Sequence, residues 1–166
     1  MRPIRIGGRR LDLTPLPAAA AAELLDDRVA AAATIGSSLP DAWPQTDLLD
    51  VLPMQAAAEP DAERFGIWLI IERDTNTVVG DIGFMGPPDG GLVEIGFSVI
   101  PDRRRRGYAT EAARSLIDWA FDDPGIREVT ARSEVENEAS ARVLHAAGFA
   151  RIGESRGVIR WRRTRS

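Results

Sequence analysis

The sequence predicts a single α/β or α+β domain built on a mixed sheet, and two observations lead to this prediction. The chain has 166 residues, of which 44% are hydrophobic and 28% charged, which suits one globular domain with a sizeable core. From residue 65 onward, apolar β-rich runs alternate with amphipathic helical runs, the pattern of strands joined by helices. No linker or repeat interrupts the sequence, so residues 1–166 are assigned to one domain.

The first third of the chain predicts one strand followed by helices. The alternating stretch "RRLDLTPL" (9–16) is typical of a strand. The stretch 17–34 begins with proline, which is favoured at a helix start, and is rich in good helix formers. A loop is expected over 35–46, and prolines within 47–63 predict a second helical region that is interrupted.

The remainder predicts most of the sheet. Two apolar runs, 65–73 and 78–86, are separated by the turn "DTNT" and predict a hairpin. A third strand, 92–100, follows the turn "PPDGG". The later elements expected are a helix over 107–122, a strand over 126–134, a helix over 137–147 and a pair of strands around 150–161.

Composition excludes several kinds of site. The chain has no cysteine and one histidine, His145, which excludes a cysteine nucleophile, disulfides, and thiolate or histidine-rich metal sites. No metal is therefore expected. All 21 basic residues are arginine, so a Schiff-base or P-loop lysine is also excluded.

Charge and hydropathy bear on partners and location. The net charge of −4 and the pI near 5.1 argue against a general nucleic-acid binder, which needs a broad basic face. No apolar run approaches the roughly 20 residues that span a bilayer. The start "MRPIRIGGRRLDL" lacks the apolar segment of a signal peptide, so a cytoplasmic protein without a membrane partner is expected.

The predicted strand 92–100 has two different faces. Val93, Ile95, Phe97 and Val99 alternate on one side and are all apolar. The other side carries Glu94, Gly96 and Ser98, flanked by Leu92 and Ile100. A carboxylate, a glycine and a hydroxyl in succession suggest either the wall of an open cleft or a partly exposed surface.

The stretch "PDRRRRGYATEAARSLIDW" (101–119) concentrates positive charge before a predicted helix. A helix N-terminus offers unpaired N–H groups and the positive end of the dipole. Glycine lets an anion approach the backbone closely, and arginine adds bidentate phosphate contacts. The run therefore predicts a phosphate-binding turn, and a solvated charge run is the alternative.

These residues also carry a family resemblance. Arg104–Ala109 fits the motif [Q/R]-x-x-G-x-[G/A] by which the GNAT superfamily of N-acetyltransferases binds acyl-CoA. The stretch "NEASARVLHAAGF" (137–149) resembles the family's second helix, which begins N-x-x-[A/S]. The combination most resembles the branch that acetylates the N-termini of ribosomal proteins. The resemblance covers about 78–150.

The resemblance implies a fold and a cofactor site. The expected sheet is mixed, largely antiparallel, flanked by helices and splayed where acetyl-CoA binds. Pantetheine is expected to lie along the strand, with a backbone amide near Ser98–Val99 facing the thioester carbonyl. Three groups of cofactor-binding residues are implied: Phe97, Ser98 and Val99 on the strand; Arg104, Arg105, Arg106, Gly107, Tyr108, Ala109 and Thr110 at the pyrophosphate; and Asn137 and Ser140 on the second helix.

The resemblance also implies a reaction, direct attack of an amine on acetyl-CoA. Glu94 matches the strand glutamate that acts as base in several family members; its alternative role is to orient a cationic substrate. Leu144 stands where many members carry a tyrosine as general acid, which leaves Ser140 or water as proton donor. The acceptor is a peptide N-terminus or a small amine, and a catalytically silent acyl-CoA-binding module is the alternative. A homodimer is compatible with the sequence.

Several residues keep a structural alternative. Asparagine is a favoured helix N-cap, so Asn137 has that role open to it as well. Trp43 is a candidate for the wall of the acceptor cleft or for a loop anchor. The acidic side chains within 25–61 suit a cationic acceptor or an ordinary solvated surface.

Overall fold

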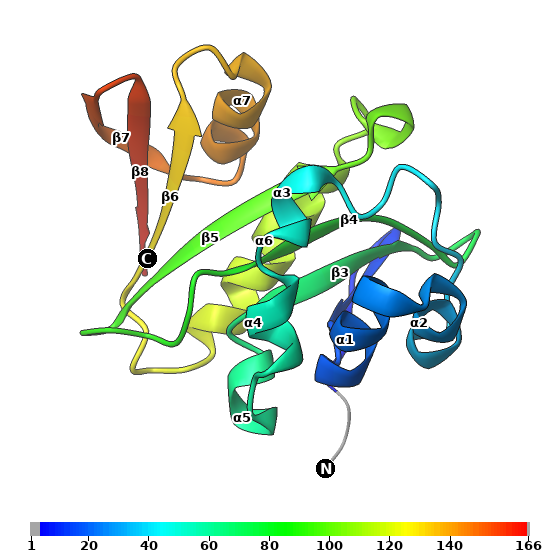
Figure 1. The fold of residues 1–166 in the computed structure, drawn as a ribbon. Helices are drawn as coiled ribbons and strands as arrows, with labels where there is room; N and C mark the ends of the chain where they lie inside the picture. The colour runs from blue at the N-terminus through cyan, green and yellow to red at the C-terminus, as the bar shows by residue number, and fades with distance from the viewer. Residues whose placement is uncertain (1–3, 166) are drawn as a thin grey trace.

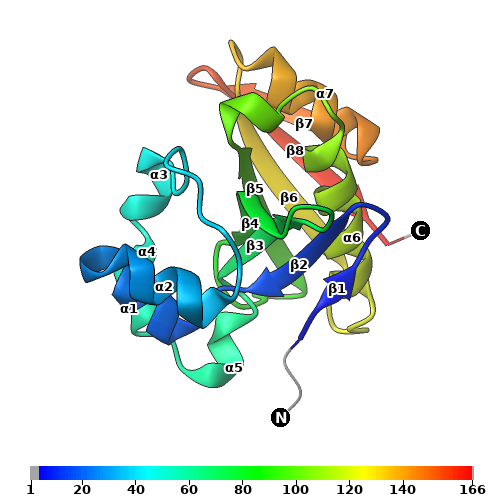
Figure 2. The same cartoon turned by 90° about the vertical axis from the view of Figure 1, so that its right-hand side faces the viewer.

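The computed structural model describes residues 4–165, and these form one sheet of eight strands. The sheet has helices on both faces (Figures 1 and 2). Its strands are β1 (Ile6–Gly7), β2 (Leu11–Pro15), β3 (Ile67–Glu72), β4 (Thr77–Phe84), β5 (Leu92–Val99), β6 (Glu128–Glu134), β7 (Ala150–Ser155) and β8 (Val158–Thr164).

The sheet is largely antiparallel and is split near its middle. The strand order is β1-β2-β3-β4-β5-β6-β8-β7, and only β5 and β6 pair in parallel. Their pairing joins Leu92–Ile95 to Glu128–Ala131 and then stops. Beyond these residues β5 pairs only with β4 and β6 only with β8. The predicted mixed, splayed sheet is therefore confirmed.

The helices separate by face, as Figure 2 shows. The N-terminal helices lie on one side of the sheet, and α6 and α7 on the other. They are α1 (Ala18–Asp26), α2 (Arg28–Ile35), α3 (Thr46–Leu49), α4 (Leu52–Ala56), α5 (Pro60–Glu63), α6 (Tyr108–Phe121) and α7 (Glu138–Ala146), with a 3₁₀ turn at Pro101–Arg103. The apolar stripe of α6 is buried against the sheet, as its helical spacing predicts.

The N-terminal third differs from the prediction in detail. The single helix expected over 17–34 is two helices, because Asp27 adopts an extended φ of −142° and its side chain accepts a hydrogen bond from the N–H of Ala30 at 3.1 Å. Asp27 thus ends α1 and caps α2. The interrupted region 47–63 is three short helices, and Pro53 and Pro60 lie in the first turns of two of them. The two-residue strand β1 was not predicted, since so short a run has no periodicity.

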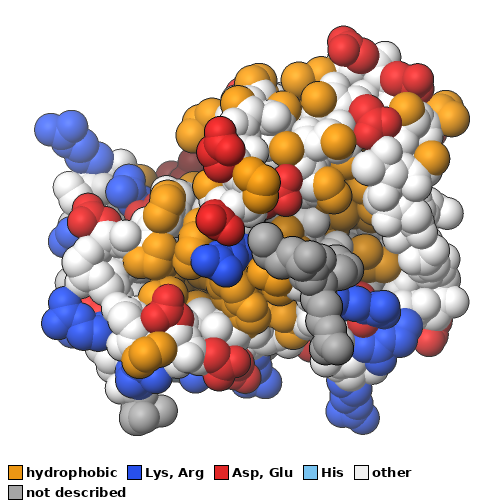
Figure 3. Space-filling model, turned by 90° about the horizontal axis from the view of Figure 1, so that it is seen from below, with side chains coloured by type: hydrophobic (Ala, Val, Ile, Leu, Met, Phe, Trp, Pro, Cys, Tyr) orange, Lys and Arg blue, Asp and Glu red, His pale blue; other side chains and the backbone are white. Residues whose placement is uncertain are grey.

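Figure 3 shows the molecule from below the view of Figure 1, at the end away from the arginine run at residues 103–106. Hydrophobic side chains gather over the middle of this face, with charged side chains around them. Within the core, Trp68 and Trp119 make an edge contact at 5.0 Å between ring centroids. Among residues 4–165, no helix combines the length and the apolar character needed to cross a membrane.

Candidate active site

The split between β5 and β6 exposes backbone groups of β5. The N–H of Met85 donates to the carbonyl of Glu94, and the N–H of Ile100 donates to the carbonyl of Val79. Backbone groups alternate along an antiparallel strand, so even-numbered residues of β5 bond to β4. The N–H groups of Phe97 and Val99 therefore point the other way, past the end of the β5–β6 pairing. They are placed to bond an extended ligand that enters the split.

The turn before α6 presents a run of unpaired amides. The N–H groups of residues 105–110 donate no hydrogen bond to any described residue. Arg105 and Gly107 have positive φ values of 64° and 79°, and such alternation curls successive N–H groups into a concave anion-binding surface. The dipole of the 14-residue α6 adds positive potential at this end. This geometry suits a polyphosphate.

The four arginines point in different directions. Arg103 and Arg106 turn inward to the carboxylate of Glu72, at 3.2 and 3.9 Å. Arg104 donates from Nε to the carbonyl of Val99 at 2.8 Å. Arg105 is exposed and makes no ion pair with another described residue. Only part of the sequence-predicted charge therefore faces outward.

Glu72, the last residue of β3, contacts the inner side of the turn before α6 through Arg103, Arg106 and Tyr108. Its carboxylate accepts hydrogen bonds from the hydroxyls of Tyr108 and Thr75, both at 2.7 Å. These bonds and the nearby Arg103 outweigh burial and lower the pKa of Glu72. The same bond raises the pKa of Tyr108. The side chain of Tyr108 is thus buried in the core, and its N–H is one of the unpaired amides of the turn.

A second support comes from the hairpin of β1 and β2. Arg10, at its tip, donates to the carbonyl of Arg106 at 2.7 Å and pairs with Glu111 at 2.8 Å. Its guanidinium also lies 4.7 Å from the ring centroid of Tyr108. Glu111, in the first turn of α6, also accepts from the backbone N–H groups of residues 10 and 11.

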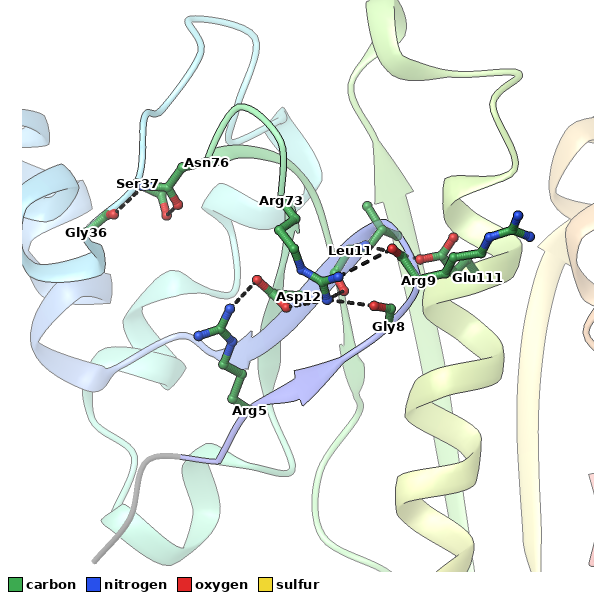
Figure 4. Close-up of polar contacts among 10 residues, drawn as sticks. All are labelled: Arg5, Gly8, Arg9, Leu11, Asp12, Gly36, Ser37, Arg73, Asn76 and Glu111. Atoms are coloured by element: carbon green, nitrogen blue, oxygen red, sulfur yellow. Dashed lines mark hydrogen bonds and ion pairs between the residues drawn. The ribbon is translucent and has the colours of Figure 1, made fainter.

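The hairpin itself is fixed by a buried carboxylate, shown in Figure 4. Asp12 pairs with Arg73 at 2.9 Å and with Arg5. Burial raises the pKa of Asp12, but the bonds from the two arginines outweigh it and leave the pKa below its usual value. Arg73 also donates to the carbonyl of Gly8 at 2.6 Å. The arrangement clamps the hairpin against β3 and so positions Arg10.

The polar face of β5 is covered by the loop between α2 and α3. The side chain of Gln45 donates to the hydroxyl of Ser98 at 2.7 Å and accepts from Arg104 at 3.2 Å. Trp43 is fully buried and donates from Nε1 to Asp81 of β4 at 3.0 Å. Of the two roles left open for Trp43, the structure gives it that of a loop anchor.

Glu94 lies on the same face of β5, four residues before Ser98. Its side chain is 26% exposed and pairs with Arg132 of β6 at 3.3 Å. Residues four apart on a strand are separated by about 13 Å. Glu94 is therefore accessible and ion-paired, and it lies away from the level of Ser98.

Helix α7 borders the split on the β6 side. Asn137 caps it by accepting from the N–H of Ser140 at 3.0 Å, as its residue type predicts. Ser140 is half-buried and His145 exposed. Leu144 is completely buried, so this position supplies packing and no proton donor.

Sequence reasoning missed four residues that shape this site. Asp81 had a signal, because it is a lone acid within a run of otherwise apolar strand residues. Glu72 had a weaker one, because it ends an apolar run and charged residues follow it. Such an acid is buried only with partners. Arg10 and Gln45 had none, since each acts on residues more than 50 positions away.

This combination of split sheet and amide-lined turn agrees with the family resemblance of the sequence. A family model described as an acetyltransferase (GNAT) domain matches residues 10–150. The chain belongs to the GNAT acetyltransferase family. The family model thus extends well before the segment on which the resemblance rested.

Individual GNAT relatives agree. YjdG of Bacillus subtilis (strain 168), named an uncharacterized N-acetyltransferase, is 36% identical over 111 residues, or 64% of this chain and 66% of YjdG. The chain thus covers just under two thirds of that relative. RimL, a ribosomal L7/L12 alpha-N-protein acetyltransferase, superposes with a TM-score of 0.70 at 17% identity, covering 99% of this chain and 96% of RimL. MccE, a microcin C7 self-immunity acetyltransferase solved with acetyl-CoA and AMP, superposes with a TM-score of 0.66 at 18% identity, covering 93% of this chain and 92% of MccE. These two structures show the shared fold.

Proposed function

We propose that the protein transfers an acetyl group from acetyl-CoA to a primary amine by direct attack within a ternary complex. The observation that carries this proposal is the conjunction of two backbone surfaces: the unpaired amides of residues 105–110 and the open edge of β5 at Phe97 and Val99. One suits a pyrophosphate and the other an extended amide-containing chain. Along the sequence, the strand residues Phe97 and Val99 precede the amides of residues 105–110 as the strand precedes the acyl-CoA motif in the family that the sequence resembles.

The described residues fit coenzyme A. The amides of Arg105, Arg106, Gly107, Tyr108, Ala109 and Thr110 would hold the pyrophosphate. Arg105 is free to meet an outer phosphate, whereas Arg104 is held at β5 and Arg106 at Glu72. Phe97 and Val99 would pair with pantetheine, next to Ser98. At the start of α7, its N-cap Asn137 and Ser140 would border pantetheine from the opposite side. Bound acetyl-CoA supplies the acetyl group as an activated thioester.

The backbone of β5 also supplies electrostatic stabilisation. The N–H of Val99 faces the split and is fixed by the β4–β5 ladder. An amide held in this way stabilises negative charge that develops on a carbonyl oxygen during attack. The alternation of the strand assigns this task to Val99 or Phe97 and leaves the amide of Ser98 bonded to β4.

On the acceptor side, Glu94 is the proposed catalytic carboxylate. An alkyl amine has a pKa of about 10, so a proton must leave it before attack at neutral pH. Glu94 is accessible and would act as base through water, or hold the charge of a cationic acceptor. Its ion pair with Arg132 favours the orienting role, because Oε1 of Glu94 is already engaged by the guanidinium.

One observation favours the alternative of a silent acyl-CoA-binding module. The single tyrosine of the chain, Tyr108, bonds to Glu72, and Leu144 is buried at the position where many family members carry their general acid. A thiolate is, however, an adequate leaving group that takes its proton from water. Proton donation is therefore a weak requirement, and we retain the enzyme as the leading proposal.

The acceptor is proposed to be a peptide N-terminus or a small amine. RimL is named as an acetyltransferase of a ribosomal-protein α-amine, and this supports the peptide. The acceptor would approach the face formed by Glu94 and the α2–α3 loop. Exposed acids in that region, Asp41, Asp47 and Asp50, would attract a cationic group.

The test combines thermal unfolding with acetyl transfer. Saturation with acetyl-CoA at 100 times its Kd should stabilise the wild type by about 2.7 kcal/mol. The variant Thr110→Glu places a carboxylate among the free amides, which favours the helix dipole but repels phosphate; Thr110→Gln is its neutral control. We expect the Thr110→Glu variant to lose this stabilisation and the Thr110→Gln variant to keep it.

Acetyl transfer is measured separately. Because the chain lacks cysteine, coenzyme A released by the reaction can be detected with a thiol reagent. The acceptors tested are peptides beginning with alanine or serine and a panel of small amines. No shift in a folded wild type would overturn the proposal, and a shift without thiol release would select the silent module.

A further inference from the structure

The molecule contains a buried carboxyl group on the acceptor face that the proposed mechanism leaves without a task. Asp81 lies in β4 directly opposite Ser98 of β5, and directly opposed residues project to the same face of a sheet. It is 9% exposed. Ser98 lies between Phe97 and Val99, the residues whose amides face the split. Asp81 is therefore at the level of the proposed reacting carbon, whereas Glu94 is about 13 Å along the strand.

Asp81 has one free oxygen. The indole of Trp43 donates to Oδ2 at 3.0 Å, and this is the side-chain hydrogen bond that Asp81 makes within residues 4–165. No buried side-chain oxygen of the described residues lacks a partner. Because Oδ1 has no hydrogen-bond partner among the described residues, it must keep some solvent-accessible surface.

Among residues 4–165, no arginine forms an ion pair with this carboxyl group. Its neighbour on β3 is Leu69 and its neighbour on β5 is Ser98; Trp43 covers it. Within the described part of the chain, the charged side chain that acts on it is Asp47 of α3. Arg104 bonds to Gln45, which bonds to the hydroxyl of Ser98, and neither of these bonds reaches Asp81. Burial, with a further contribution from Asp47, raises the pKa of Asp81 to about 7, although the Trp43 bond lowers it. A carboxyl poised near neutrality and lacking a cation is suited to receive one.

We propose that Asp81 binds the ammonium of the acceptor at Oδ1 and takes its first proton, while Glu94 orients the remainder of the acceptor. This inference rests on the proposed function and assigns the base within it. In the step, one N–H bond breaks and its proton goes to Asp81. The neutral amine forms the N–C bond with the acetyl carbon, and the C–S bond breaks. The second proton passes from nitrogen to the departing sulfur, and Asp81 returns its proton to solvent.

Substitutions of two neighbours of Asp81 should shift its pKa in opposite directions, which provides a test. Trp43 lowers the pKa of Asp81 and Asp47 raises it. The acid limb of the kcat/KM profile, which reports the free enzyme, should have its midpoint at about 7 in the wild type. Trp43→Phe should move this limb to higher pH, and Asp47→Asn should move it to lower pH. Asp89→Asn, an exposed acid in the β4–β5 loop, should leave it unchanged.

Substitution of Asp81 itself measures how much this residue contributes to kcat/KM. Asp81→Asn keeps an oxygen for the Trp43 indole, so it should retain the fold and bind acetyl-CoA within about twofold of the wild type. Its kcat/KM should fall by roughly 10²- to 10⁴-fold, the usual contribution of a general base, and the limb near pH 7 should disappear. Glu94→Gln should raise KM for the acceptor and keep the limb. Wild-type activity and an unchanged limb in Asp81→Asn, or loss of the limb in Glu94→Gln, would overturn the proposal.

A measurement without turnover separates this inference from the proposed function. The N–H resonance of the Trp43 indole, identified by its loss in Trp43→Phe, should titrate with a midpoint of about 7 in the free protein. Asp47→Asn should lower that midpoint. A wild type that shows this titration but releases no thiol with any amine would refute the proposed function, whereas active wild type with no titration near neutrality would refute the role of Asp81 alone. If the Asp81→Asn variant fails to fold, the shifts of the acid limb in Trp43→Phe and Asp47→Asn still test the role of Asp81: limbs that do not move would refute it.

Discussion

The hydroxyl of Tyr108 donates a 2.7 Å hydrogen bond to Oε2 of Glu72, the last residue of β3. Tyr108 is the first residue of α6, so this bond fixes the start of that helix to the centre of the sheet. Glu72 also draws in Arg103 and Arg106. One buried carboxylate thereby shapes the turn whose outer surface carries the free amides.

Tyr108→Phe should destabilise the fold by about 2 kcal/mol at neutral pH, the value of a hydrogen bond to a charged group. The Tyr108 bond is the largest influence lowering the pKa of Glu72. A carboxylate with a lowered pKa stabilises the fold above its unfolded pKa, and this stability is lost as pH falls through the folded value. The difference between variant and wild type should therefore shrink in acid. Urea unfolding at several pH values measures it, and an equal difference at all pH values would contradict the prediction.

Arg10→Ala should weaken acetyl-CoA binding although Arg10 need not touch the ligand. Its guanidinium holds the carbonyl of Arg106 and pairs with Glu111. Loosening the turn should raise the Kd for acetyl-CoA by roughly tenfold, or about 1.4 kcal/mol. Arg9→Ala is the matched control, since Arg9 is exposed on the same hairpin and has the same charge. Calorimetric titration of both variants measures the effect, and equal losses would indicate charge alone.

Much of the fold could be predicted because periodicity reports burial. The stripe of α6 and the alternation of β5 each recur often enough to fix which face is inward. The break at Asp27 could not be predicted in this way, because a helix-forming composition continues on both sides of it. The break depends on a single extended residue and its side-chain cap.

The site was predictable in its backbone and less so in its side chains. The motif around Gly107 indicated a turn of free amides, which depends on local conformation. The direction of each arginine depends on Glu72, Gln45 and the carbonyl of Val99, which belong to other elements. Local sequence does not specify such long-range contacts.

Asn137 combines a cap with a proposed contact to pantetheine, and two substitutions separate these roles. Asn137→Ala should cost about 1 kcal/mol, because the N–H of Ser140 loses its acceptor. Asn137→Ser keeps a capping oxygen and should be nearly as stable as the wild type, but it lacks the amide donor. If the amide binds pantetheine, both variants lose affinity for acetyl-CoA. Unchanged affinity in Asn137→Ser would leave Asn137 as a cap only.

Asp81 should make the protein less stable as pH rises toward neutrality. Its pKa is raised from 3.8 to about 7 in the folded state, so the native state binds more protons than the unfolded chain between these values. Stability then falls over that interval and levels off above it. From pH 5 to pH 8 the loss should be roughly 2–3 kcal/mol.

Asp81→Asn should abolish this loss. The amide cannot ionise but still accepts from the Trp43 indole, so the variant should match or exceed the wild type in stability at pH 8. The carboxylates of Glu72 and Asp12 titrate in the opposite sense, because their pKa values are lowered, and they contribute equally to both proteins. The difference between the two unfolding curves therefore isolates Asp81. A difference that stays constant from pH 5 to 8 would show that this carboxyl does not titrate near neutrality, which would also remove the basis for its role as a base.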